Sequence, residues 1–383
     1  MTRTRRATVA MLLVGLAIFS SLYSTQAILP TLVKNMGLSS TEAAMTVSAA
    51  TGALAICVVP ASILSERFGR GRILLISAVA ATSVGLIVPL AQAGWQLILL
   101  RGVQGALLSG APATAMAWLS EELDDNALPR AMGLYIAGTS VGGLTGRLIP
   151  TGLVELSTWR WSLFGSALVS LAFAITSWLL LPAQRNFRPK AIHLKNETRV
   201  VFSHWANRDL ALLFLSAFLS MGTFVSMYNF LTFRLIDDFG LAPSLAGLAF
   251  LFYLTGTWSS ARAGSLVTRI GHGKTLFASA VLFTLGIALC AGNLPMTLLG
   301  MIAFTVGFFA VHSTASGWVG QIATHDRAEA SSMYVFCYYF GSSVVGACAG
   351  LLFDALSWPF FIAFFTAVAL TLTALTWTKI KTD

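Results

Sequence analysis

Three ionisable side chains lie inside long apolar segments of this 383-residue sequence: Arg101, Arg147 and His312. A charged side chain inside a lipid bilayer is costly, so such residues face a partner or a water-filled cavity. The imidazole of histidine has an ordinary pKa of about 6.5 and titrates near physiological pH. These residue types, placed in apolar segments, therefore indicate ligand binding or proton transfer within a membrane.

Each of the three residues has a functional and a structural interpretation. We expect Arg101 to contact a ligand or to tune a nearby proton carrier; the alternative is that it donates to backbone carbonyls and locks two helices together. We expect His312 to couple protons or to bind a ligand, unless it is a packing histidine beside Ser313 and Thr314. For Arg147 we favour a structural or gating salt bridge with an acid at the outer rim; the alternative is direct contact with a ligand. The candidate acids are Glu155, Asp237, Asp238 and Asp354.

The acidic residues are informative because of where they do not occur. None of the 15 Asp and Glu residues lies near the centre of an apolar segment. Exporters of cationic compounds commonly use a buried carboxylate to pair with the cation, whereas this chain offers arginine and histidine. A cavity of positive potential favours neutral or anionic amphipathic molecules, and this is the substrate class that we expect.

The elements that must position these side chains are transmembrane helices. The chain is 56% hydrophobic and 10% charged, with a mean hydropathy of +0.78, whereas soluble domains are about one quarter charged. This composition excludes a soluble enzyme, a nucleic-acid-binding module and a disordered protein. Segments of about 20 apolar residues span a bilayer as helices, and we predict twelve of them. They are 7–29, 42–64, 72–91, 95–120, 128–154, 160–181, 210–234, 243–268, 274–292, 295–321, 328–352 and 356–377.

Basic residues orient the predicted helices. With the N-terminus inside, most of the 24 Lys and Arg residues fall on the inner side, and only Lys34, Arg160 and Arg234 fall outside. Such an excess of basic residues in inner loops is typical of membrane proteins, so we expect both termini in the cytoplasm. The net charge of +9 then follows from the topology and indicates no nucleic-acid partner.

The sequence repeats itself at an offset of about 202 residues. Residues 64–72 and 266–274 share the frame Arg-apolar-Gly-basic-Gly-basic, and the polar stretch 182–209 separates six predicted helices from six. Weaker matches pair Gly37 with Gly240, Tyr23 with Tyr228, and Gly143 with Gly346. We therefore predict an all-α membrane protein of two pseudo-symmetric six-helix bundles, 1–181 and 210–383, joined by the cytoplasmic linker 182–209.

No sequence motif indicates catalysis or a cofactor. The four cysteines lie in apolar stretches and form no CxxC pair; they are Cys57, Cys290, Cys337 and Cys348. A phosphate-binding P-loop, an H-E-x-x-H zinc motif and a G-x-S-x-G nucleophile motif are all missing from the sequence. We expect neither an enzyme nor a metal or other cofactor.

At its motifs the chain resembles the major facilitator superfamily, over nearly its full length. The family's loop motif, G-x-x-x-D-R-x-G-R-R-R, corresponds to residues 62–72, with Glu66 in place of the aspartate and Gly71 in place of one arginine. The motif R-x-x-Q-G is intact at residues 101–105, which favours the drug:proton antiporter branch. The Gly-Gly-Leu-Thr-Gly-Arg run at 142–147 lacks the proline of that branch's usual motif and is similar to the YnfM-like group of efflux permeases.

The resemblance implies roles for particular residues, because in this family helices 1, 4, 7 and 10 line a central cavity. We expect one set of residues to bind substrate or couple protons: Arg101, His312, Gln26, Tyr23, Tyr228, Asn229 and Gln104. We expect a second set to act in gating: Glu66, Arg67, Gly69, Arg70, Arg147 and Arg269. Within this set, Glu66 is expected to pair with Arg70 or to cap a neighbouring helix in one state.

These observations together predict a monomeric secondary transporter in a prokaryotic plasma (inner) membrane. We expect it to export a small amphipathic neutral or anionic molecule by alternating access, as a proton antiporter. Its partners are then a small-molecule substrate, protons and the lipid bilayer. The alternative is a proton-coupled importer or facilitator of an organic anion or sugar, which has the same fold. A membrane enzyme or sensor would need a catalytic constellation that the sequence lacks.

Overall fold

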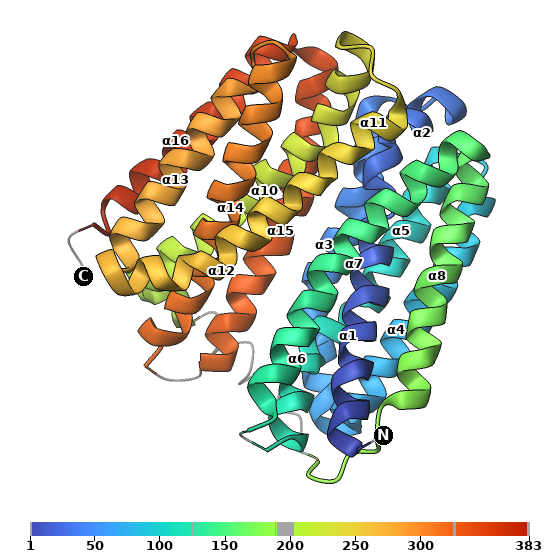
Figure 1. Ribbon diagram of the computed structural model, residues 1–383, viewed down its shortest axis with the longest axis vertical. Coiled ribbons are helices and arrows are strands. Elements are labelled where there is room, and N and C mark those ends of the chain that lie inside the picture. The colour runs from blue at the N-terminus through green and yellow to red at the C-terminus, as the bar shows by residue number, and fades with distance from the viewer. Residues whose placement is uncertain (1, 125, 188, 190–202, 325–326, 381–383) are drawn as a thin grey trace. The chain divides into compact units, whose positions relative to one another are not determined.

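The computed structural model describes residues 2–124, 126–187, 189, 203–324 and 327–380. Every regular element in these residues is helical (Figure 1). The chain forms two compact units, one of Met1–Leu38 with Met45–Leu194 and the other of Ser39–Ala44 with Lys195–Asp383. Half of the predicted linker, at 188 and 190–202, lies outside the described residues.

The first unit contains the first six predicted spans. Its elements are α1 (Arg3–Leu22), η1 (Gln26–Ile28), α2 (Leu29–Met36), α3 (Ser40–Phe68), α4 (Arg70–Ile87), η2 (Val88–Leu90), α5 (Gly94–Leu108), α6 (Gly110–Glu122), α7 (Leu128–Leu156) and α8 (Trp159–Leu180). The first turn of α3 groups with the second unit. The predicted first span, 7–29, is confirmed as part of Arg3–Met36, which is long and apolar enough to cross a membrane. It is not one continuous helix, because the chain leaves the helix after Leu22 and resumes through η1 and α2.

The second unit contains the other six predicted spans. Its elements are η3 (His204–Ala206), α10 (Arg208–Phe233), the π-helical turn η4 (Arg234–Asp238), α11 (Pro243–Leu248), η5 (Ala249–Phe252), α12 (Tyr253–Ile270), α13 (His272–Leu289), α14 (Leu294–Ile322), α15 (Arg327–Ala355) and α16 (Trp358–Trp377). The first span of this unit, α10, is continuous where the first span of the other unit is broken.

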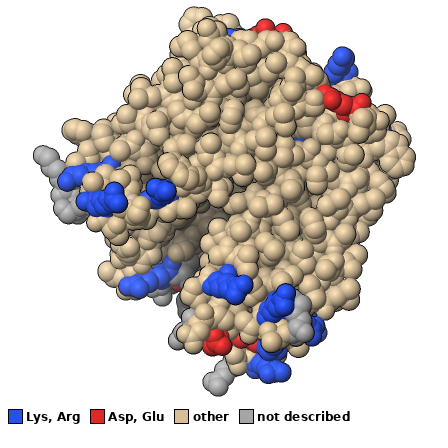
Figure 2. All heavy atoms as spheres, viewed as in Figure 1, with Lys and Arg blue, Asp and Glu red and all other residues tan. Residues whose placement is uncertain are grey.

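Nine helices of the described chain are long and apolar enough to cross a membrane by length and composition. The remaining three predicted spans are formed by α5 with α6, by α7, and by α11 with η5 and α12. The span of α5 and α6 is divided at Ser109, so neither helix is long enough by itself. Arginines lower the mean hydropathy of the other two spans: Arg130 and Arg147 in α7, and Arg262 and Arg269 in α12. On the face drawn in Figure 2, most of the surface carries no charge, as a surface in contact with lipid requires.

The backbone confirms the internal repeat. Among the described residues, the glycines with positive φ are Gly37 (66°), Gly69 (102°), Gly240 (67°) and Gly271 (87°). They form two repeat-related pairs with nearly matching angles, one at the end of the first span and one in the loop between the second and third spans. L-residues avoid this conformation, so each half needs a glycine at the same turn.

Glycines also bring helices close together within the first unit. A Cβ built on Gly146 would lie 2.4 Å from Ser20 O of α1, and one built on Gly138 would lie 2.4 Å from Leu12 O. The glycines of α7 thus let a neighbouring helix approach closely, as small residues do at membrane helix contacts. The neighbour is α1, so Arg147, one residue after Gly146, is held beside the point where α1 ends.

Candidate functional site

The candidate site is built around the break in the first span. In α1 the helix ends at Leu22, and Ser24 N and Ser24 Oγ both donate to Ser21 O, at 3.5 and 3.1 Å. Gln26 N then donates to Tyr23 O, which starts the short helix η1. The last carbonyls of a helix have no partner within it, and inside a membrane each must be satisfied by protein or water.

Arg101 of α5 supplies donors to these carbonyls. Its Nη1 donates to Ser21 O at 2.8 Å, its Nη2 donates to Leu22 O, and its Nε donates to Thr46 O of α3 at 3.2 Å. The side chain is fully buried. A cation at a helix C-terminus also interacts favourably with the helix dipole. The contacts of Arg101 are thus those of the carbonyl-binding alternative, and its predicted contact with substrate stays a prediction.

Gln104 lies one turn after Arg101 and orients it. Gln104 Oε1 accepts from Arg101 Nη1, and Gln104 Nε2 donates to Ala81 O of α4 at 3.1 Å. The last residue of the motif, Gly105, lets α5 approach α3, because a Cβ there would lie 2.0 Å from Ala50 O. The R-x-x-Q-G motif therefore acts as one structural unit that fixes α5 against α1, α3 and α4.

Arg147 of α7 lies on the other side of the break. Its Nε donates to Gln26 Oε1 at 2.8 Å, its Nη1 donates to Gly143 O at 2.5 Å, and its Cζ lies 4.0 Å from the centroid of the Tyr23 ring. The structure therefore brings together Tyr23, Gln26 and Arg147, which the sequence analysis had assigned to two different roles. All three are buried.

Two of the four acids expected as partners for Arg147 contact other residues. Asp238 pairs with Arg234, and Asp354 accepts hydrogen bonds from Thr41, which belongs to the same unit. An acidic partner for Arg147 stays a prediction. The amide of Gln26 and the face of the Tyr23 ring are suited to holding a guanidinium, so these two residues fix the Arg147 side chain beside the break in α1.

His312 of α14 forms a polar and aromatic cluster in the second unit. Its Nδ1 lies 3.1 Å from Tyr334 Oη of α15, and Tyr334 Oη also donates to the His312 backbone carbonyl at 3.3 Å. The ring of Tyr338 lies 4.6 Å away between centroids. His312 and Tyr338 are half-buried, whereas Tyr334 is buried. Sequence analysis missed Tyr334, although its polar side chain in a predicted span was a possible signal.

Tyr228 and Asn229, the expected counterparts of Tyr23 and Gln26, are fully buried within the second unit. Tyr228 Oη lies 2.8 Å from Thr305 Oγ1, and its ring packs against Phe224, with 5.0 Å between centroids. Their predicted contact with substrate stays a prediction. The two units thus differ at this pseudo-symmetric position, since one holds an arginine over the tyrosine ring and the other a cluster of phenylalanines.

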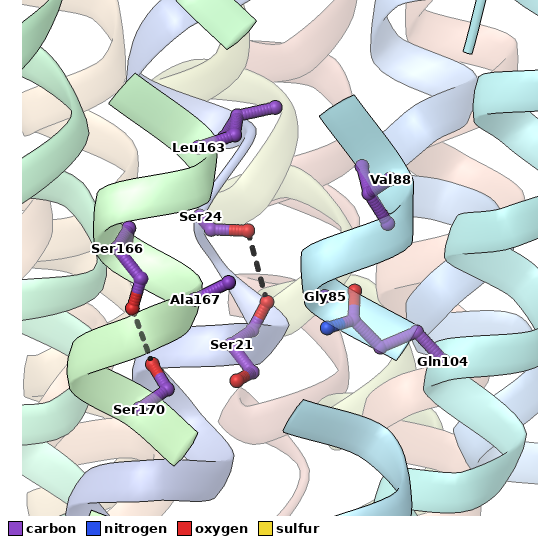
Figure 3. A pocket seen from close by; sticks show the side chains of 9 residues that line it. All are labelled: Ser21, Ser24, Gly85, Val88, Gln104, Leu163, Ser166, Ala167 and Ser170. Atoms are coloured by element: carbon purple, nitrogen blue, oxygen red, sulfur yellow. Dashed lines mark hydrogen bonds between the residues drawn. The ribbon is translucent and has the colours of Figure 1, made fainter. Parts of the chain in front are cut away.

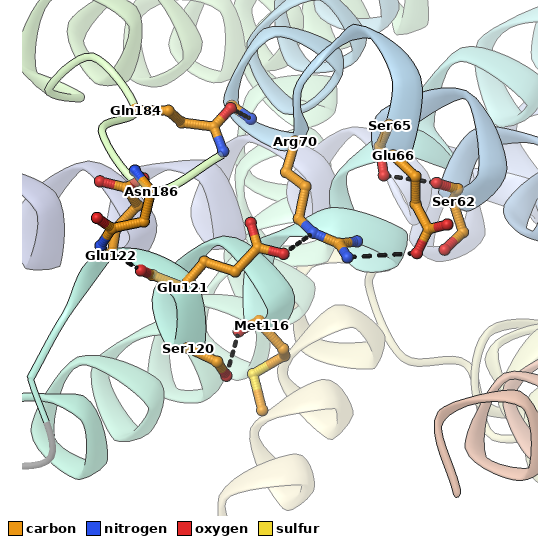
Figure 4. A network of polar contacts seen from close by, with 11 residues as sticks. Ser62, Ser65, Glu66, Arg70, Met116, Ser120, Glu121, Glu122, Gln184 and Asn186 are labelled. Carbon is orange, nitrogen blue, oxygen red and sulfur yellow. Dashed lines mark hydrogen bonds and ion pairs between the residues drawn. The ribbon is translucent and has the colours of Figure 1, made fainter. Parts of the chain in front are cut away.

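The predicted gating loop forms a charged network at the end of the first unit where α3 and α6 finish and α4 begins (Figure 4). Arg70 pairs with Glu66 at 3.4 Å and with Glu121 of α6 at 2.5 Å. The first of these pairs is one of the two contacts that we expect for Glu66. Glu121 was missed by sequence analysis, because nothing in the sequence aligns α6 with this loop. Arg67 and Arg269 are exposed, and Arg67 Cζ lies 5.7 Å from the Phe68 ring.

The same network explains why glycine replaces an arginine of the family motif at position 71. A Cβ built on Gly71 would lie 2.9 Å from Trp118 Nε1, and Gly71 N donates to Gln184 Oε1 at 2.9 Å. Next to Gln184, the backbone NH groups of Arg185 and Asn186 donate to Glu122, which also pairs with Arg3 at 2.6 Å. The start of the linker is therefore fastened to the loop and to α6.

Comparisons with known proteins agree with this architecture. The model of the Major Facilitator Superfamily matches residues 11–250 and 212–383. The inner membrane transport protein YnfM of Escherichia coli is 35% identical over 95% of this chain and 89% of its own length. The uncharacterized MFS-type transporter YybF of Bacillus subtilis is 33% identical over 92% and 88%, and the multidrug resistance protein MdtG of Proteus mirabilis is 29% identical over 76% and 73%.

Solved structures share the fold at low sequence identity. The nucleoside transporter NupG, in its D323A mutant, superposes with a TM-score of 0.83 at 13% identity, over 99% of this chain and 100% of that one. A D-xylose-proton symporter superposes with a TM-score of 0.75 at 14% identity, over 99% and 98%.

Proposed function

Because the chain belongs to the Major Facilitator Superfamily, and is thus a multi-pass membrane transporter and not an enzyme, we propose that it exports a small amphipathic neutral or anionic compound in exchange for protons. The protein then works as a monomer in the plasma membrane with both termini in the cytoplasm. Export is supported by the likeness to a multidrug resistance protein and by the intact R-x-x-Q-G motif.

The proposed substrate class rests on where the charged side chains lie in the helices. Arg101 and Arg147 are buried in the first unit, at 0% and 1% exposure. In the residues that the structure describes, every Asp and Glu within a helical element lies near its end, for example Glu66 in α3 and Glu155 in α7. A site with buried cations and no carboxylate at mid-span repels a cationic substrate and attracts an anionic one.

The proposed mechanism is alternating access by rocking of the two halves. His312 is the proposed proton carrier, because it titrates near neutral pH when unperturbed and is the histidine at mid-span. The Glu66–Arg70–Glu121 network is the proposed gating element, together with Arg67, Gly69 and Arg269, since it ties the loop to α6 and must rearrange if that loop moves.

A second candidate is the uptake of an organic anion or sugar with protons. It is favoured by the likeness in fold to a D-xylose-proton symporter and by the 27% identity to a probable 4-methylmuconolactone transporter of Cupriavidus pinatubonensis. The two candidates share the substrate charge and differ in direction, so that a single assay separates them.

The test is transport in proteoliposomes under imposed pH gradients, with probes matched in skeleton and opposite in charge. Rhodamine 123 and fluorescein share a xanthene ring system and differ in charge. We expect proton-driven movement of the anionic dye and little movement of the cationic one. Protons and dye moving in opposite directions indicate the antiporter, and movement in the same direction indicates the importer. Preferential transport of the cation would contradict the proposed substrate class.

The residues are tested in the same vesicles with Arg101→Ala and His312→Ala. We expect His312→Ala to remove the dependence on the pH gradient and Arg101→Ala to reduce transport of the anion. A Tyr135→Phe variant serves as a control, because Tyr135 is a buried tyrosine that lies outside the proposed sites. Normal transport with unchanged pH dependence in both alanine variants would show that the site assignment is wrong.

A further inference from the structure

A small polar cavity lies inside the first unit, beside the break in α1. It is lined by residues of α1, α4, α5 and α8 and of the segments that directly follow α1 and α4, and its volume is about 10 Å³. Figure 3 shows its lining, in which five of the nine residues are polar. The polar residues are Ser21, Ser24, Gln104, Ser166 and Ser170. A cavity of this size accommodates one water molecule.

Two hydroxyl groups that line this cavity have no partner among the described protein residues. They are Ser21 Oγ of α1 and Ser166 Oγ of α8, and the two residues are only 4% and 2% exposed. A buried hydroxyl without a hydrogen bond is costly. The position of these two groups around one water-sized space therefore points to a ligand that can both donate and accept.

Gln104 adds a donor to the same space. One hydrogen of its Nε2 is directed to Ala81 O, and its Oε1 accepts from Arg101. The amide NH₂ group has a second hydrogen, and Gln104 lines the cavity. A group that accepts this hydrogen would hold the amide in the orientation in which Oε1 faces Arg101.

We propose that an ordered water molecule occupies this cavity and hydrogen-bonds to Ser21 Oγ, Ser166 Oγ and Gln104 Nε2. Such a water molecule has three partners, which is typical of buried water. It ties the broken end of α1 to α8 and fixes the amide that orients Arg101. A sodium ion would find hydroxyl ligands here, but the guanidinium of Arg101 is one side chain away and repels a cation. The proposal is independent of the substrate and direction proposed above.

The first test is thermal unfolding of the purified full-length protein with two matched serine variants on α8. Ser166→Ala removes a hydroxyl that lines the cavity, and Ser177→Ala removes a buried hydroxyl that is also without a described partner but lies outside the cavity. If water is bound, Ser166→Ala loses a hydrogen bond and lowers Tm, whereas Ser177→Ala leaves Tm equal or higher. A raised Tm for Ser166→Ala, or an equal fall for both variants, would overturn the proposal.

The second test detects the water and excludes a cation. Radiolytic hydroxyl labelling in H₂¹⁸O modifies side chains next to bound water, and Leu163 lines the cavity. We expect labelling of Leu163 in the parent and its loss in Ser166→Val, which fills the space. We also expect the same Tm in sodium chloride and in choline chloride. An unlabelled Leu163, or a sodium-dependent Tm that Ser166→Ala abolishes, would refute the water.

Discussion

Replacing Gly105 by alanine should separate α5 from α3 and thereby weaken the contacts of Arg101. The Cβ would lie 2.0 Å from Ala50 O and 2.6 Å from Ala50 C and Cα. Carbon and oxygen approach to about 3.3 Å in close helix contacts, so the two backbones must move apart by about 1.3 Å. Both partners are backbone or backbone-attached atoms, and no side-chain rotation can relieve the overlap.

The cost of that separation has two parts. Overpacking in a well-packed core costs about 1–3 kcal/mol. A shift of this size can also stretch the 2.8 Å bond from Arg101 Nη1 to Ser21 O beyond the hydrogen-bond range, and a hydrogen bond to a charged group contributes about 1.5–3 kcal/mol. We therefore expect Gly105→Ala to lose about 2.5–6 kcal/mol, which is a large part of a typical stability of 5–15 kcal/mol.

The matched control is Gly102→Ala in the same helix and motif. The nearest atom to a Cβ on Gly102 is Ala49 Cβ at 3.9 Å, an ordinary contact, and alanine favours a helix by about 1 kcal/mol over glycine. By thermal unfolding in detergent, we expect Gly105→Ala to lower Tm by at least about 5 °C, taking about 2–4 °C per kcal/mol, and Gly102→Ala to leave it equal or higher. If both variants match the parent in Tm and transport, the close approach of α5 to α3 is refuted.

Four further outcomes follow from individual contacts. Gly71→Ala should lose about 1–3 kcal/mol because its Cβ meets Trp118 Nε1 at 2.9 Å, whereas Gly133→Ala, with no atom within 4 Å, should not; Tm measures both. Arg147→Lys keeps the charge but loses the planar group held by Gln26 and Tyr23, so Tm should fall by more than in Arg160→Lys, which lies at the start of α8. Glu121→Gln should destabilise more than Glu66→Gln, by up to about 1 kcal/mol at low salt, because Arg70 lies 2.5 Å from the first acid and 3.4 Å from the second; equal effects would contradict the network. Tyr334→Phe removes the partner of His312 Nδ1 and should displace the pH profile of transport, and an unchanged profile would argue against His312 as the proton carrier.

Prediction from sequence succeeded where local chemistry sets the structure. Apolar length identifies the spans, and the helix boundaries agree to within a few residues for α3, α8 and α14. The repeated loop frame was readable because only glycine adopts positive φ without strain, and Gly69 and Gly271 have that conformation. Likewise, intramembrane charge marked Arg101 and Arg147 as exceptional before their partners were known.

The break in α1 escaped prediction because no proline or glycine lies within it, although Pro30 follows in the first turn of α2 and cannot donate to the carbonyl four residues before it. The residues around it, Tyr23 to Gln26, can all continue a helix. Arg101 satisfies the carbonyls that the break exposes, and Arg147 contacts the side chains of Tyr23 and Gln26. Those partners come from α5 and α7, about 80 and 120 positions away. A pairing over such distances is settled by packing of the helices, which a hydropathy pattern does not encode.

The sequence alone determined that this protein is a helical membrane protein with an internal repeat, because span length, charge position and glycine turns are properties of short stretches, while its motifs placed it by resemblance among transporters. Only the tertiary structure decided which atoms the unusual residues contact. In that structure Arg101 donates to backbone carbonyls, and Arg147 contacts Gln26 and Tyr23. His312 contacts Tyr334, and Arg70 pairs with Glu121. The physical reason is that each buried polar group must find a partner within about 3 Å, and that partner depends on how the helices pack.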